Sequence, residues 1–150
     1  MKTCLMAIAM AAALGACATG TGLSDADRLQ LYRAHAGEPV KDFQYFNSLN
    51  GWTELGDSAL AVWTRPSEAY LLELSGPCLD LSYSPAISIS NQFGRVSARF
   101  DSVRVIGAGP GPNIPCRIQT IRPLDVKAIR TSEKELREAR VQEREAGDTQ

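Results

Sequence analysis

Short runs that alternate apolar and polar residues, separated by glycine- and proline-containing turns, occupy the chain from about residue 40 to residue 121. Because successive side chains of a strand point to opposite faces, this period of two predicts half-buried β-strands. Many short strands with such turns are typical of a small antiparallel β-sandwich or barrel, so we expect a mainly β fold. The expected strands lie at about residues 41–46, 52–55, 59–64, 69–74, 86–90, 95–100, 103–106 and 116–121.

The alternation also predicts which faces are buried. Residues 59–63, Ala-Leu-Ala-Val-Trp, are apolar at every position, which favours a central strand covered on both faces. The apolar phase slips between Phe100 and Val103, so we expect a bulge or corner at Asp101-Ser102. In the strand at residues 95–100, we expect Val96, Ala98 and Phe100 to point inward. In the strand at residues 69–74, we expect Tyr70, Leu72 and Leu74 to share one face and Ala69, Leu71 and Glu73 to share the other. Core packing is the expected use of the aromatic residues Trp52, Trp63, Tyr70, Tyr83 and Phe100.

A helix is expected on each side of this β region. Ser24 is expected to be the N-cap of a short first helix, which Gly37 and Pro39 should end. Residues 132–135, Ser-Glu-Lys-Glu, fit a capping box for a second helix within a charged tail at residues 126–150. The apolar stripe of the tail is narrow, which favours a solvated, fraying helix over a helix that binds a partner.

The first sixteen residues read as a secretory signal peptide. Lys2 supplies a positive charge, an uncharged apolar run follows from Leu5 to Leu14, and Gly15 and Ala16 are small. The run is shorter than the roughly 20 apolar residues of a transmembrane helix, which argues against the alternative of an uncleaved membrane anchor.

Residues 14–17, Leu-Gly-Ala-Cys, resemble the lipobox of bacterial lipoproteins, in which the cysteine thiol receives a diacylglycerol before cleavage. The resemblance implies that Cys17 is the lipidated N-terminus of the mature chain, joined by a tether at residues 17–23 to a domain at residues 24–125. The alternative is a free or disulfide-bonded Cys17 behind an ordinary signal peptide. In such lipoproteins an Asp after the cysteine marks retention at the inner membrane, so Ala18 favours the outer membrane, facing the periplasm.

Cys78 and Cys116 form the pair that remains once the signal peptide, with Cys4, is removed and Cys17 is acylated. In an oxidising compartment we expect these two cysteines to form a disulfide, although two buried free thiols are the alternative. Their spacing fits neither a CxxC redox motif nor a zinc site. We therefore expect no metal and no cofactor.

Catalytic chemistry finds little support in the sequence. The single histidine, His35, lies outside the β region, and the Gly107–Pro112 stretch lacks the Gly-Lys-Ser/Thr ending of a phosphate loop. The chain has 16 Lys and Arg against 17 Asp and Glu, a balance that gives no reason to expect nucleic-acid binding. We therefore expect a protein that is not an enzyme. This expectation would be contradicted if two or three of its acidic side chains met in one pocket. The acids to examine are Asp57, Glu68, Glu73, Asp80 and Asp101.

Residues 38–125 resemble a family of small exported gram-negative proteins known only as a domain of unknown function. The resemblance rests on Trp52 with Leu55, residues 60–63 and 69–74, Cys78 with Leu81, and residues 116–118 and 121–125. It implies the β fold and the pairing of Cys78 with Cys116, leaves the charged tail outside, and implies no activity. We expect a lipid-anchored binding or accessory module with an envelope protein as partner. The alternatives are a periplasmic inhibitor or chaperone-like partner of an envelope enzyme and, less favoured, a hydrolase.

Overall fold

The computed structural model describes residues 22–107 and 109–147. The predicted signal peptide at residues 1–16, Cys17 and most of the tether lie outside this range. The elements are, in chain order, α1 (Asp25–Ala34), β1 (Asp42–Gln44), β2 (Gly51–Glu54), β3 (Ala59–Arg65), β4 (Glu68–Leu74), the 3-10 helix η1 (Leu81–Tyr83), β5 (Ala86–Ile89), β6 (Arg95–Ser97), β7 (Ser102–Ile106), β8 (Cys116–Leu124) and α2 (Val126–Gly147). No helix within the described ranges is long and apolar enough to cross a membrane.

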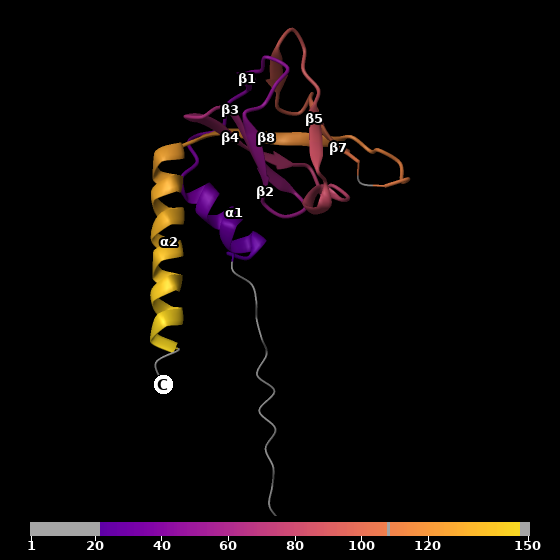
Figure 1. Cartoon of the computed structure of the whole chain (residues 1–150). Helices are drawn as coiled ribbons and strands as arrows, with labels where there is room; N and C mark the ends of the chain where they lie inside the picture. The colour runs from indigo at the N-terminus through magenta and orange to yellow at the C-terminus, as the bar shows by residue number, and fades with distance from the viewer. Residues whose placement is uncertain (1–21, 108, 148–150) are drawn as a thin grey trace, which may run out of the picture.

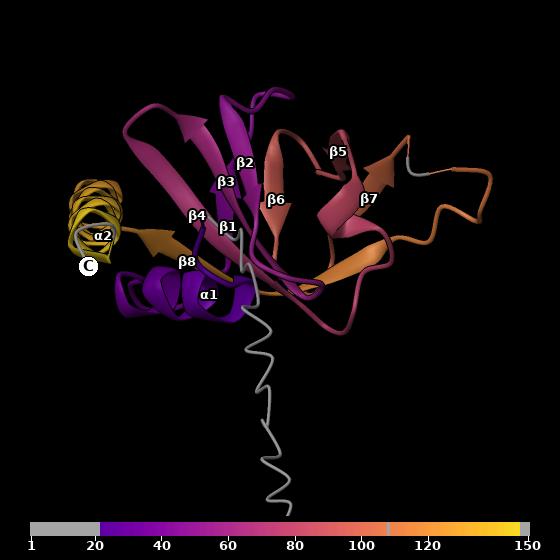
Figure 2. The same cartoon turned by 60° about the horizontal axis from the view of Figure 1, so that its bottom comes forward.

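The strands form two antiparallel sheets (Figures 1 and 2). The large sheet has the order β2-β3-β4-β8-β7-β5, and the small sheet pairs β1 with β6. The expected mainly β fold with a short N-terminal helix and a charged C-terminal helix is confirmed. The architecture is sandwich-like and not a barrel, because the large sheet ends at β2 and β5 without closing.

Strand β4 shows how the large sheet buries both of its faces. Tyr70, Leu72 and Leu74 point into a core beneath the small sheet, as predicted, which we call the sandwich core. Ala69 and Leu71 point into a second core beneath the helices, which we call the helix core. Besides Leu72 and Leu74, the sandwich core buries Phe43, Tyr45, Leu60, Val62, Cys78, Leu81, Ile89, Val96, Val103, Ile118 and Ile121. Besides Ala69 and Leu71, the helix core buries Tyr32, Leu55, Ala59, Ala61, Leu124, Val126 and Ile129.

The central position predicted for residues 59–63 is confirmed. Strand β3 lies between β2 and β4, and its first four residues are fully buried. Leu60 and Val62 enter the sandwich core while Ala59 and Ala61 enter the helix core. A strand covered on both faces has no position that solvent can occupy, which explains why its sequence does not alternate.

The corner before β7 differs from the expected one. Strand β6 ends at Ser97, the chain turns with Arg99 in the left-handed region (φ 69°), and the inward place predicted for Phe100 is wrong, because its side chain is 78% exposed. Asp101 is buried at this turn, where its carboxylate accepts hydrogen bonds from Ser90 Oγ (2.7 Å) and Ser97 N (2.8 Å). The slip in phase therefore marks the passage of the chain from the small sheet to the large one.

The two helices are capped by the residues that precede them. Ser24 accepts a hydrogen bond from Asp27 N, so the predicted first cap is confirmed. The capping box predicted at Ser132 is wrong: α2 starts at Val126, and Asp125 accepts from Ala128 N at 2.9 Å. Val126 and Ile129 are buried in the helix core, so α2 begins as part of the domain and becomes solvated only after its first turns.

Candidate functional site

A disulfide joins the segment after β4 to the first residue of β8. The Cα atoms of Cys78 and Cys116 lie 5.6 Å apart across 38 residues of sequence, and the Cys78 side chain is buried. The predicted pairing is confirmed, and the alternative of two free thiols is excluded.

The loop around Cys78 is shaped by local backbone contacts. Cys78 N donates to Asp57 O (2.7 Å), and Leu81 N donates to Cys78 O (3.3 Å). Asp80 adopts a left-handed conformation (φ 63°), which aspartate tolerates better than most residues. The turn leaves the neighbouring Leu79 side chain 71% exposed beside the disulfide.

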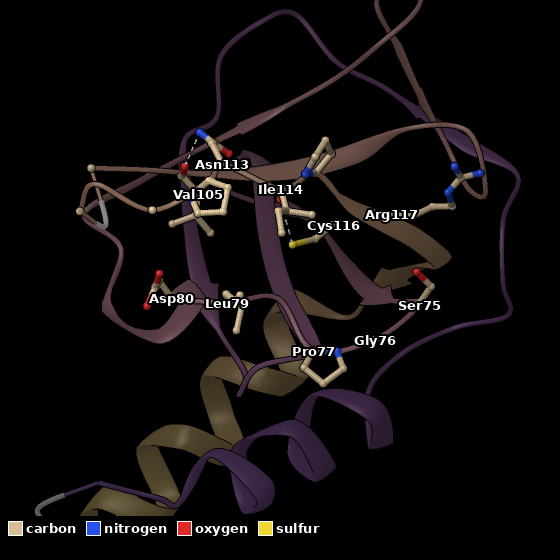
Figure 3. Close-up of a pocket in the computed structure, with 15 residues that line it drawn as sticks. Ser75, Gly76, Pro77, Leu79, Asp80, Val105, Asn113, Ile114, Cys116 and Arg117 are labelled. Carbon is tan, nitrogen blue, oxygen red and sulfur yellow. Dashed lines mark hydrogen bonds between the residues drawn. The ribbon is translucent and has the colours of Figure 1, made fainter.

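An open groove of about 610 Å³ lies beside the disulfide, between the segment after β4 and the loop from β7 to β8 (Figure 3). Pro77 and Leu79 line one side, and Val105, Asn113 and Ile114 line the other. Leu79 and Ile114 are 71% and 58% exposed, so the groove presents two large apolar side chains to solvent.

The glycine- and proline-containing stretch after β7 is one wall of this groove. Gly107 (φ 81°) and Gly109 (φ 118°) adopt backbone conformations that other residues rarely adopt. Asn113 Nδ2 donates to Val105 O at 3.0 Å and so attaches the far part of the loop to β7. The sequence predicted a plain surface loop and missed the groove, because its other wall lies more than twenty residues earlier in the chain.

The lining of the groove contains few ionisable side chains. Asp80 is the one carboxylate among the lining residues, and Arg117, the one cation, donates from Nη1 to Arg99 O at 3.1 Å. Ser75 and Asp80 lie at opposite ends of the groove (Figure 3), and no histidine lines it, so the lining holds no nucleophile beside a base.

No two of the five acids singled out in the sequence line the same pocket among the five best-formed pockets of the described residues. Glu68 accepts from Thr64 (2.7 Å) and lies 3.6 Å from Arg65, Glu73 pairs with Arg33 at 2.7 Å, and Asp101 is buried at the corner. Asp80 lines the groove and Asp57 is exposed in a turn. The described residues also hold no group of three metal-binding side chains. The absence of catalysis and of metal binding stays a prediction.

Glu73 and Tyr32 are two titratable groups with shifted pKa values that contact the helices. Burial by itself would raise the pKa of Glu73, but hydrogen bonds from Arg33 and Thr120 hold it below its usual value. Burial, and then the neighbouring Glu133 carboxylate, raise the pKa of Tyr32, so its hydroxyl stays protonated and donates to Glu133 Oε1 at 3.1 Å. Both groups therefore fix the helices to the sheet or to each other.

The aromatic residues and His35 occupy places that the sequence indicated only in part. Trp52, Trp63 and Tyr70 pack against the two cores as expected, whereas core positions for Tyr83 and Phe100 are wrong, because these side chains are 87% and 78% exposed. His35 is half-buried at the end of α1, with Nε2 3.1 Å from Ser132 Oγ of α2. The histidine thus contacts the other helix, which its place in the sequence did not indicate.

Comparison with known proteins finds no matching curated protein and no matching solved structure. One family model, described as "Family of unknown function (DUF6491)", matches residues 1–140. The match is wider than the resemblance in the sequence, and the expectation that the charged tail lies outside the family is wrong over most of α2. The start of α2 is also structurally part of the domain, because Val126 and Ile129 are buried in the helix core. The chain belongs to this family of unknown function.

Proposed function

We propose that the protein is a lipid-anchored envelope lipoprotein that acts as a non-enzymatic binding or accessory module. Acyl chains on Cys17 hold it at the outer membrane, facing the periplasm, and it needs no cofactor. The Cys78–Cys116 disulfide supports export, because disulfides persist in oxidising compartments such as the bacterial periplasm.

The observation that carries the binding role is the groove beside the disulfide. Its exposed Leu79 and Ile114 side chains are suited to apolar contacts, and a site of this kind gains affinity from burying them. The occupant that fits is an extended, apolar segment of another envelope protein, whose side chains would lie between Pro77 and Leu79 on one side and Ile114 on the other.

Lipidation is tested at Cys17. The Cys17→Ser variant should lose labelling by a fatty-acid probe and accumulate as an unprocessed precursor, because the thiol is the attachment point. Unchanged labelling of this variant would show that the lipid is elsewhere or absent.

The groove is tested by crosslinking in intact cells. Leu79→Asp and Ile114→Asp place a charge in the groove and should each remove a crosslinked species that the wild-type protein forms. Phe93→Asp is the matched control, because Phe93 is fully exposed and lies outside the lining of the groove. Loss of the species in all three variants, or in none, would contradict binding in the groove.

A second candidate is an inhibitor or chaperone-like partner of an envelope enzyme. The feature that favours it is the loop between β7 and β8, whose described part projects from the sheet (Figure 2). Replacing residues 110–113 by glycine and serine would abolish inhibition of an envelope hydrolase if the loop enters its active site, and Leu79→Asp would leave that inhibition unchanged.

A further inference from the structure

The side of the molecule where the chain enters from the tether carries a second groove. Helix α2 runs from the end of β8 back past α1, so that its C-terminal end and the start of α1 point the same way, away from β1 and β5 (Figure 1). A groove of about 200 Å³ lies there, between Gly22, Leu23 and Arg28 on one side and α2 on the other.

The charge of this groove is strongly positive. Arg137, Arg140 and Arg144 line it together with Arg28, against the single acid Glu133. Spacings of three, four and seven residues place the three α2 arginines on one helix face. Glu133 already accepts a hydrogen bond from Tyr32, and Arg28 contacts Glu54 at 3.4 Å. The three α2 arginines form no ion pair with any residue in the described ranges.

The same face of α2 is apolar between its arginines. It begins with Val126 and Ile129, which are buried in the helix core. It continues with Leu136 and Val141, which line the groove and are 37% and 48% exposed. The packing face of the helix is therefore longer than the domain that covers it.

The distance from the expected lipid to this groove is short. Five residue steps separate Cys17 from Gly22, and a fully extended chain spans at most about 18 Å over that number. Acyl chains on Cys17 would therefore keep the arginine face close to the headgroups of the lipid leaflet. A basic side chain at such a surface favours binding by about fivefold, and arginine matches phosphate oxygens with paired N–H donors.

We propose that Arg137, Arg140 and Arg144 bind the phosphate groups of anionic phospholipids in the leaflet that holds the acyl chains. Arg28 completes the groove, and Leu136 and Val141 lie against the headgroup region. This contact directs α2 and the start of α1 toward the bilayer and the β1–β6 sheet away from it. The inference deepens the proposed function, because it rests on lipidation at Cys17.

The test uses the full mature lipidated protein reconstituted in vesicles. Amide hydrogen exchange is followed in α2 with phosphatidylglycerol-containing vesicles and with phosphatidylcholine vesicles. Exchange in residues 136–147 should be at least about tenfold slower on the anionic vesicles, since three arginines together favour the bound state by roughly 100-fold. Raising the salt concentration should remove most of the difference.

Two variants that each lose three positive charges distinguish the effect of the α2 arginine face from the effect of net charge. The triple variant Arg137→Gln, Arg140→Gln and Arg144→Gln should exchange equally fast on both vesicles. The control Lys41→Gln, Arg99→Gln and Arg104→Gln removes three exposed positive charges from the β region and should behave as the wild type.

Each other outcome contradicts the proposal in a distinct way. If the acylated wild-type protein exchanges at equal rates on both kinds of vesicle, the docking of α2 on anionic lipid is wrong, but the lipid anchor at Cys17 is not contradicted. If adding inorganic phosphate slows the exchange of α2 on phosphatidylcholine vesicles, the arginines bind a free anion and not a lipid headgroup. Protection that occurs only in native envelopes would indicate a protein on this face. An intact mass without acyl chains on Cys17 would overturn the proposed lipid anchor and, with it, the orientation derived from the tether.

Discussion

The two faces of the large sheet are held by different physical means. On the sandwich side, the buried residues are apolar or aromatic, and a disulfide closes the region covalently. On the helix side, a smaller apolar core is edged by polar contacts, namely Arg28–Glu54, Tyr32–Glu133, Arg33–Glu73 and His35–Ser132. Apolar packing is largely indifferent to pH and salt, whereas charged contacts respond to both. We therefore expect the stability of the sandwich side to change little with pH and salt, and the stability of the helix side to depend on both.

The largest effect should come from removing the disulfide. We expect the double variant Cys78→Ala and Cys116→Ala to lose about 4 kcal/mol of unfolding free energy, because the loop of 38 residues is no longer closed in the unfolded chain. Urea unfolding without reductant measures the loss. Reducing the wild-type protein should produce a similar shift, and an unchanged urea midpoint would show that packing alone holds this side.

Neighbouring leucines of β4 compare the two cores directly. Leu72 faces the sandwich core and Leu71 the helix core, and both are fully buried. Leu72→Ala and Leu71→Ala should each lower the unfolding free energy by about 3 kcal/mol through lost contacts and a cavity. Hydrogen exchange should separate them, with faster exchange in β1 and β6 for the first and in α1 and α2 for the second. The same pattern in both variants would mean that the two cores unfold as one.

A smaller effect is expected from the contact between the helices. Tyr32→Phe removes the hydroxyl that donates to Glu133 and should lower the unfolding free energy by about 1 kcal/mol. Glu133→Gln keeps an acceptor and should lower it less. Urea unfolding at neutral pH distinguishes the two variants, and the opposite order would show that the charge of Glu133, not the hydrogen bond, matters.

The smallest effect should depend on pH. Because the pKa of Glu73 is lowered in the folded protein, its ionised form stabilises the fold above the usual carboxyl pKa of about 4.3, and this contribution is lost as pH falls through the folded-state value. Glu73→Gln should lower the unfolding free energy at pH 7 by up to about 1 kcal/mol, and the difference should vanish in acid. The exposed Glu138→Gln is the control. A difference that does not change with pH would exclude the Arg33–Glu73 pair as its cause.

Prediction from the sequence succeeded where contacts are local and failed where they are not. The strands were located to within a few residues, and the Ser24 cap was identified, because alternation and capping involve residues close together in the chain. The start of α2 was missed although Asp125, three residues before Ala128, was a usable signal for it. Phe100 was misplaced because the alternation was extended past Ser97 into a turn whose left-handed Arg99 no periodic pattern reveals.

By itself, the sequence determined the alternating faces of the strands, the all-apolar central strand and the first helix cap. Side-chain periodicity and backbone sterics act over a few residues, so these features can be read directly from the order of the residues. The tertiary structure alone decided that helices cover one face of the large sheet and a second sheet the other. It also decided that Leu79 and Ile114 line the two sides of one groove and that the α2 arginines lie beside Gly22. Those contacts join residues tens of positions apart, and they form only when every apolar face is buried against another element in the same fold.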